Sequence, residues 1–287
     1  MIQLRSGGSA ATLLPDLGGA IGSFAVGDVP ILRPTPANAA SPLDAACFPL
    51  VPYANRIADG RFTFAGEDYA LPRNVASFKH PIHGLGWIMP WMVKAQEANR
   101  AVLACMHSAD EHWPWDWFAT QAFVLEDGAL QVTLEVTNQS DRAMPCGLGH
   151  HPYLVRNPRA EVTFIAEGVW LSDARMVPVE TAPADTFGDF GAGAMPNPVN
   201  LTDNCWFGWQ GEARLGTVSV TSSEARFLHL YAPPGENFLC LEPTTAMPDA
   251  FGRHGGGTAV LDPGQSASLG MVIRTAPTDR LILSRGT

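Results

Sequence analysis

Apolar and polar residues alternate along much of the chain with a period of two. Residues 131–137 (QVTLEVT) show the pattern most clearly, and a turn sequence at 138–141 follows them. Residues 218–231 read as two strands joined by a Ser-Ser-Glu turn, and shorter alternating stretches occur at 161–167, 259–261 and 271–274. Successive side chains of a strand point to opposite faces of its sheet, so this pattern predicts half-buried β-strands. The 3.6-residue period of a helix hardly extends beyond one turn anywhere.

The spacing of these strands predicts an all-β fold. Short strands at roughly ten-residue intervals, with turn residues between them, are typical of antiparallel sandwiches and barrels. The 28 glycines and 24 prolines supply the turns, and only 16% of the residues are charged, which leaves little sequence for long solvated helices. A stretch at 181–199 is loop-like, but no linker or internal repeat divides the chain. We therefore predict one large domain over residues 1–287.

Charge and cysteine content exclude several classes of function. The 18 Lys and Arg residues against 28 Asp and Glu residues give a net charge of −10, and no basic cluster exists that would suit a nucleic acid. The five cysteines are scattered without a C-x-x-C pair, which is typical of buried thiols in a reducing compartment. Pro15 and Asp16 interrupt the only candidate leader segment, and no apolar run reaches the roughly 20 residues of a membrane span. We expect a cytoplasmic protein with no membrane partner.

Four segments place polar, titratable groups inside apolar sequence rich in Gly and Pro. They carry Asn55-Arg56, His83, the pair His150-His151, and Glu242. Two histidines and a glutamate are a known zinc set, but the helical H-E-x-x-H spacing is missing, and we expect no metal. There is no G-x-S-x-G nucleophile elbow either. Acid–base chemistry is favoured instead, because histidine titrates near neutrality and burial can raise the pKa of a glutamate towards it.

Neighbouring residues constrain which groups can act. On a strand only one of His150 and His151 can point inward, so at most one of them is expected to be catalytic. The other histidines are expected to be ordinary surface or half-buried residues, namely His80, His107, His112, His229 and His254. The alternating tryptophans 113, 115 and 117 predict three indoles on one strand face, packed in the core rather than exposed at a binding surface.

The same segments resemble the signatures of the aldose 1-epimerases, or galactose mutarotases. Residues 55–66 (NRIADGRFTFAG) are similar to the first signature, and residues 82–84 (IHG) to the second. Residues 151–154 (HPYL) and 240–243 (CLEP) are similar to the third and the last. All four occur in the order of the family, and the resemblance extends from about residue 15 to residue 274. It implies a large single-domain antiparallel β-sandwich.

The resemblance also implies roles for individual residues. Glu242 corresponds to the general base that takes the proton of the anomeric hydroxyl, and His151 to the general acid that protonates the ring oxygen. His83 corresponds to a second histidine near the ring oxygen. Arg56, with its neighbour Asn55, and Asp203 correspond to substrate-binding residues. The reaction involves no oxidation or reduction, so no cofactor is expected, and Trp87 or Trp206 is expected to provide an aromatic face for the sugar.

The identity of the substrate follows less directly from the sequence than the chemistry does. Residues 150–154 (HHPYL) are closer to the sugar-phosphate mutarotases than to the galactose enzymes. A phosphorylated sugar requires clustered cations, however, and only Arg56, Arg61, Arg73 and Lys79 lie near the site in sequence. We therefore expect a neutral monosaccharide, with a hexose 6-phosphate as the alternative. A non-catalytic sugar-binding protein on the same fold stays open, as does the choice between monomer and homodimer. A lyase or hydrolase ranks last, because Asp203 is the sole candidate for a second carboxylate.

Overall fold

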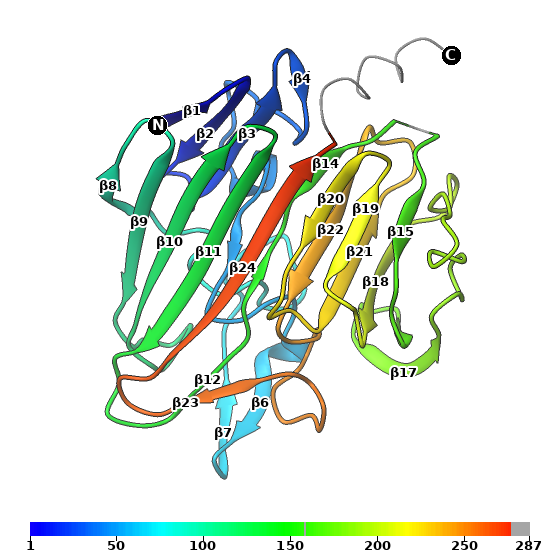
Figure 1. The fold of residues 1–287 in the computed structure, drawn as a ribbon. Helices are drawn as coiled ribbons and strands as arrows, with labels where there is room; N and C mark the ends of the chain where they lie inside the picture. The colour runs from blue at the N-terminus through cyan, green and yellow to red at the C-terminus, as the bar shows by residue number, and fades with distance from the viewer. Residues whose placement is uncertain (158, 277–287) are drawn as a thin grey trace.

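Two eight-stranded antiparallel sheets form the body of the molecule (Figure 1). The computed structural model describes residues 1–157 and 159–276. The first sheet has the order β15 (Val162–Phe164), β19 (Glu212–Leu215), β20 (Val218–Thr221), β24 (Ser266–Thr275), β11 (Ala129–Asn138), β10 (Trp117–Glu126), β9 (Arg100–His107) and β8 (Met92–Gln96). The second has the order β17 (Pro178–Pro183), β16 (Gly168–Ser172), β18 (Thr202–Phe207), β21 (Phe227–Ala232), β22 (Phe238–Thr244), β13 (Gly149–His150) and β5 (Pro49–Leu50), with β14 (Tyr153–Val155) also paired to β22.

Smaller elements surround these sheets. A four-stranded sheet runs β1 (Ile2–Ser6), β2 (Ser9–Leu14), β3 (Ala20–Val26) and β4 (Val29–Pro30), and two-strand ribbons are formed by β6 (Arg61–Phe64) with β7 (Glu67–Ala70) and by β12 (Met144–Cys146) with β23 (Ala259–Leu261). The helices among the described residues are two 3-10 turns, η1 (Pro42–Asp44) and η2 (Ala58–Gly60). Within the described ranges no helix has the length and apolar character needed to cross a membrane. The prediction of an all-β antiparallel sandwich is confirmed.

The predicted alternation is visible in the long central strands. In β10 every second residue is buried, and β11 pairs with it along ten residues. The two strands predicted within 218–231 exist as β20 and β21, but they belong to different sheets, so the turn between them crosses the sandwich. Trp113, Trp115 and Trp117 are all buried as expected, but of these three only Trp117 lies in a strand. Trp113 and Trp115 lie in the preceding loop, so the prediction that the three indoles share one strand face was wrong.

The second sheet is buried on both faces, and this positions the functional residues. Leu228, Leu230, Leu239 and Leu241 of β21 and β22 face the other sheet and join the main hydrophobic core. The intervening residues of the same strands point to the opposite face, which loops cover. The single-domain assignment for residues 1–287 stays a prediction, and its last residues, 277–287, lie outside the described ranges.

Candidate active site

The loop-covered face of the second sheet forms the floor of a pocket with a volume of about 460 Å³. Strand register assembles this floor. Tyr153 pairs with Cys240 and Gly149 with Thr244, so His151 lies opposite Glu242 in the same register. On the other side of β22, His229 of β21 pairs with Glu242. Cross-strand partners share a face, so three titratable side chains from distant parts of the chain form one row.

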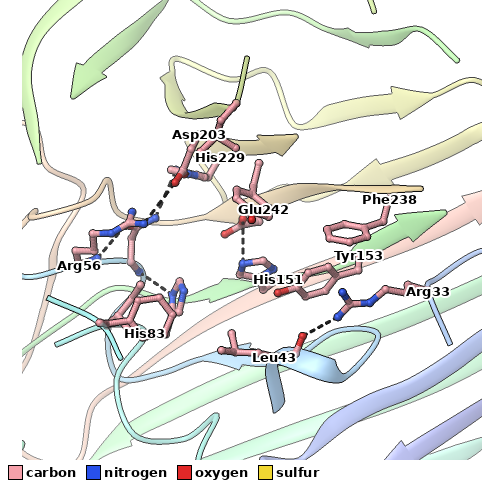
Figure 2. Close-up of a pocket in the computed structure, with 15 residues that line it drawn as sticks. Arg33, Leu43, Arg56, His83, His151, Tyr153, Asp203, His229, Phe238 and Glu242 are labelled. Carbon is pink, nitrogen blue, oxygen red and sulfur yellow. Dashed lines mark hydrogen bonds and ion pairs between the residues drawn. The ribbon is translucent and has the colours of Figure 1, made fainter. Parts of the chain in front are cut away.

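A second row of side chains lies on the same face, two residues further along each strand. Tyr153, Cys240, Tyr231 and Asp203 are successive cross-strand partners on β14, β22, β21 and β18. Segments outside these strands also line the pocket, with Arg33 and Leu43 from one part of the chain and Asn55, Arg56, Phe78, Ile82 and His83 from another. Figure 2 shows His151 and Glu242 between Arg56 at one end and Arg33 at the other.

His151 and Glu242 are the central pair. Nε2 of His151 lies 3.3 Å from Oε1 of Glu242, and the two side chains are 10% and 2% exposed. Burial raises the pKa of Glu242 to about 8, and it lowers the pKa of His151 to about 3. Both shifts disfavour charge, so at neutral pH the pair holds one transferable proton, which resides on the carboxyl group.

His83 is positioned by an unusual backbone. Asn55 and His83 both have left-handed backbone angles, with φ of 58° and 61°. Such angles are strained for a histidine and persist where the surrounding structure enforces them. The backbone N–H of Asn55 donates to Nδ1 of His83 at 3.2 Å, which leaves Nε2 to carry the hydrogen. Burial holds the pKa of His83 well below its usual value, so this imidazole is a neutral donor at the pocket wall.

Arg56, Asp203 and His229 form a charged cluster at one end of the pocket. Nη2 of Arg56 lies 3.4 Å from one carboxylate oxygen of Asp203, and Nε2 of His229 lies 2.5 Å from the other. Burial opposes the charge of Asp203, but the hydrogen bond and charge of His229, with Arg56, lower its pKa to about 2. Burial likewise opposes charge on His229, and the hydrogen bond to Asp203 outweighs it, so the pKa of His229 is raised. Arg56 also donates from Nη1 to Oδ1 of Asn55 at 2.9 Å.

His229 was not expected at the site. The prediction of a surface or half-buried residue was wrong, because the side chain is buried and lines the pocket. The alternation of residues 227–231 places His229 and Tyr231 on one face, but the sequence does not show that this face adjoins Glu242. The same prediction was wrong for His80 and His107, which are buried outside this pocket.

Arg33 was also missed. Its guanidinium carbon lies 3.8 Å from the centroid of the Tyr153 ring and 4.7 Å from that of Phe238, in cation–π geometry. Nη2 donates to the carbonyl oxygens of Leu43 and Ala45 at 2.7 and 2.9 Å. Arg33 forms no ion pair within residues 1–157 and 159–276, and its buried Nε has no hydrogen-bond partner there. No signal in the local sequence marks it as a pocket residue.

The structure does not place either candidate tryptophan in the pocket. The indole N–H of Trp87 donates to the carbonyl oxygens of Ile82 and Gly84, and the ring stacks on Phe48 behind the pocket wall. Trp206 is buried in the main core. The aromatic side chains that do line the pocket are Phe78, Tyr153, Tyr231 and Phe238. His150 is buried away from the pocket, consistent with only one of the adjacent histidines facing it.

Residues 1–274 of the sequence match the family model described as aldose 1-epimerase. The chain belongs to the aldose 1-epimerase family. It is 33% identical to the uncharacterized protein YphB of Escherichia coli K12, over 95% of this chain and 98% of that one. The structure of a candidate aldose 1-epimerase from the same bacterium superposes with a TM-score of 0.89 at 30% identity, over 96% of this chain and 98% of the other.

A more distant member shares the fold. The structure of a GalM/aldose epimerase homologue from Caenorhabditis elegans has a TM-score of 0.79 at 19% identity, and the match covers 96% of this chain and 98% of that one. The resemblance of the four sequence signatures to the epimerase family is thus confirmed.

Proposed function

We propose that the protein is an aldose 1-epimerase that interconverts the α and β anomers of a monosaccharide. The observation that supports this most directly is the contact of 3.3 Å between His151 and Glu242 on the pocket floor. Mutarotation removes a proton from the anomeric hydroxyl and delivers one to the ring oxygen, and ring closure reverses both transfers. The catalyst therefore needs one group that accepts a proton beside one that donates a proton.

The number of protons held by His151 and Glu242 suits this reaction cycle. In the proposed mechanism Glu242 is the base for the anomeric hydroxyl and His151 is the acid for the ring oxygen. The resting pair, with a neutral carboxyl and a neutral imidazole, holds the same number of protons as the carboxylate–imidazolium pair that the mechanism requires. Among the neighbouring charges, those of His229 and Arg56 lower the pKa of Glu242 and favour its ionised form, whereas that of Asp203 raises it. One proton passing across the 3.3 Å contact converts the resting pair into the reactive one.

The remaining groups are suited to holding a polyhydroxylated ring. His83 presents a neutral donor, Arg56 presents further donors, and Asp203 presents acceptors already fixed by their partners. Tyr153, Phe238 and Phe78 supply apolar surface for the face of the sugar. Fixed partners keep these side chains in place before substrate arrives, which lowers the entropic cost of binding.

A direct test is the relaxation of freshly dissolved α-anomers, followed by polarimetry or NMR with and without the protein. The panel contains glucose, galactose, xylose, arabinose and glucose 6-phosphate. Faster relaxation of at least one sugar, abolished in Glu242→Gln, supports the proposal. Saturable binding without acceleration would instead favour the non-catalytic sugar-binding alternative.

Arg33 favours a second candidate, an aldose that carries an anionic group. The neutral-sugar expectation depended on the basic residues nearest in sequence, but Arg61, Arg73 and Lys79 do not line the pocket, whereas the distant Arg33 does. A guanidinium that forms no ion pair with any described residue suits a phosphate or carboxylate on the end of the sugar near Arg33. Preference for glucose 6-phosphate over glucose, with inhibition by inorganic phosphate, would select this candidate.

A further inference from the structure

Cys240 is a buried thiol beside the central pair that the proposed proton transfers do not use. It lies on β22 two residues before Glu242, so both side chains point to the pocket face of the sheet. The ligand atoms of His151, Cys240 and Glu242 all lie within 4.8 Å of one another, and the three residues are buried. An imidazole, a thiol and a carboxyl group together form a donor set typical of zinc and related ions.

The spacing of these donors is close to that of a tetrahedral site. With bonds of about 2.0–2.1 Å to nitrogen and oxygen, two such ligands of a tetrahedral ion lie about 3.3 Å apart. Nε2 of His151 and Oε1 of Glu242 are 3.3 Å apart. A sulfur ligand, with its longer bond of about 2.3 Å, belongs about 3.5 Å from each of them. The thiol of Cys240 lies within 4.8 Å of both, so a displacement of about 1 Å completes a three-ligand face.

We infer that His151, Cys240 and Glu242 form a binding site for a borderline-soft divalent cation of the zinc class, which excludes sugar from the catalytic pair. A thiolate and a carboxylate together neutralise a dication, so the ion enters this buried position without leaving net charge there. The fourth coordination position is left for water from the pocket. The site itself follows from the donor geometry, whereas inhibition by the bound ion rests on the proposed function.

Metal binding is tested first without any activity assay. Cobalt(II) is titrated into the purified full-length protein, and absorbance is followed for the thiolate-to-cobalt charge-transfer band and the intense visible bands of tetrahedral cobalt. The affinity for zinc is then measured by competition with a chromophoric chelator. We expect one equivalent of cobalt to bind with the thiolate band, zinc to displace it, and Cys240→Ala to weaken zinc binding by at least about tenfold.

Cys205→Ala is the matched control. Cys205 is another buried cysteine on the pocket face of this sheet, and it pairs in register with His229. The same substitution there removes a buried thiol without touching the proposed ligands, so cobalt and zinc binding should match those of the wild type. Cobalt binding without the thiolate band would overturn the inference, as would equal zinc affinity in Cys240→Ala and the wild type. Equal loss in Cys205→Ala would also overturn it.

Inhibition is measured separately. If the wild type accelerates anomer relaxation, zinc should inhibit it reversibly, chelator should restore the rate, and Cys240→Ala should keep the basal rate with at least about tenfold lower sensitivity to zinc. Inhibition of equal strength in Cys240→Ala would refute the inference while leaving the epimerase proposal intact. Cobalt binding with the thiolate band in a protein that accelerates no sugar would refute the epimerase proposal and uphold the metal site.

Discussion

Replacing Glu242 with glutamine separates catalysis from stability. Glutamine has nearly the shape of a protonated glutamate but cannot exchange a proton. Loss of one acid–base group typically costs about 10²–10⁴-fold in rate, or about 3–5 kcal/mol of transition-state stabilisation. We expect Glu242→Gln to lose activity by this factor and to retain much of its affinity for sugar, because Arg56, Asp203 and His83 are unchanged.

The same substitution should stabilise the fold at neutral pH. Burial raises the pKa of Glu242 from 4.5 to about 8, so between these values the native state holds a proton that the unfolded chain has released. The free energy of unfolding of the wild type therefore falls as pH rises through this window, by about 1.4 kcal/mol per pH unit. At pH 7, 2.5 units above the unfolded value, the cost is on the order of 3 kcal/mol. Glutamine does not titrate and avoids this cost.

The assay compares urea unfolding of the wild type and Glu242→Gln at pH 4.5, 6 and 7, alongside anomer relaxation rates. We expect similar stability at pH 4.5, a variant more stable by on the order of 3 kcal/mol at pH 7, and a rate lower by orders of magnitude. A variant that is both inactive and less stable at pH 7 would show that Glu242 has a structural role. A variant with a near wild-type rate would refute its assignment as the base.

Three further predictions concern other residues. His151→Asn should lower the rate of anomer relaxation by about 10²–10⁴-fold, whereas His150→Asn should have a mild effect on that rate. Equal losses of rate in the two variants would contradict the assignment of His151 as the residue that faces the pocket. Burial lowers the pKa of His150 from 6.5 to about 4, so native stability should be lost as pH falls through this window, by about 3 kcal/mol in all. The pH dependence of unfolding of His150→Gln should lack this contribution. A pH profile equal to that of the wild type would contradict the prediction. Arg33→Met should leave kcat/KM for neutral sugars within about threefold of the wild-type value. For an acidic sugar that the wild type accepts, it should reduce kcat/KM at least tenfold, since a charged hydrogen bond contributes about 1.5–3 kcal/mol. Equal losses for both sugars would indicate that Arg33 supports the pocket wall instead.

Most of the fold class could be predicted from local pattern. The alternation at residues 131–137 reflects a strand with one face in the core, and β11 shows the same period in its burial. The same local information failed at 113–117, where alternating tryptophans suggested a strand but Trp113 and Trp115 lie in a buried loop. Aromatic residues pack into the core from loops as well as from strands, so alternation over so few residues does not distinguish the two.

The family resemblance predicted only part of the candidate site. Asn55, Arg56, His83, His151, Asp203 and Glu242 all line one pocket, as the resemblance implied. Trp87 was predicted to contact the substrate because of its chemistry and its neighbours in sequence. In the structure its indole N–H donates to backbone carbonyls behind the pocket wall. A tryptophan suited to stacking on sugar is also suited to filling a core, and only its surroundings separate the two roles.

The sequence by itself determined the period of the strands, the absence of helical pattern and the order of the family signatures. These are local properties, because two-residue periodicity follows from the geometry of a single strand. The tertiary structure decided which faces meet. His229 reaches the site because β21 pairs with β22 in the register that sets it opposite Glu242, and Arg33 reaches it because its guanidinium stacks on Tyr153. Pairing between distant segments depends on the packing of the whole sandwich, and local alternation does not encode it.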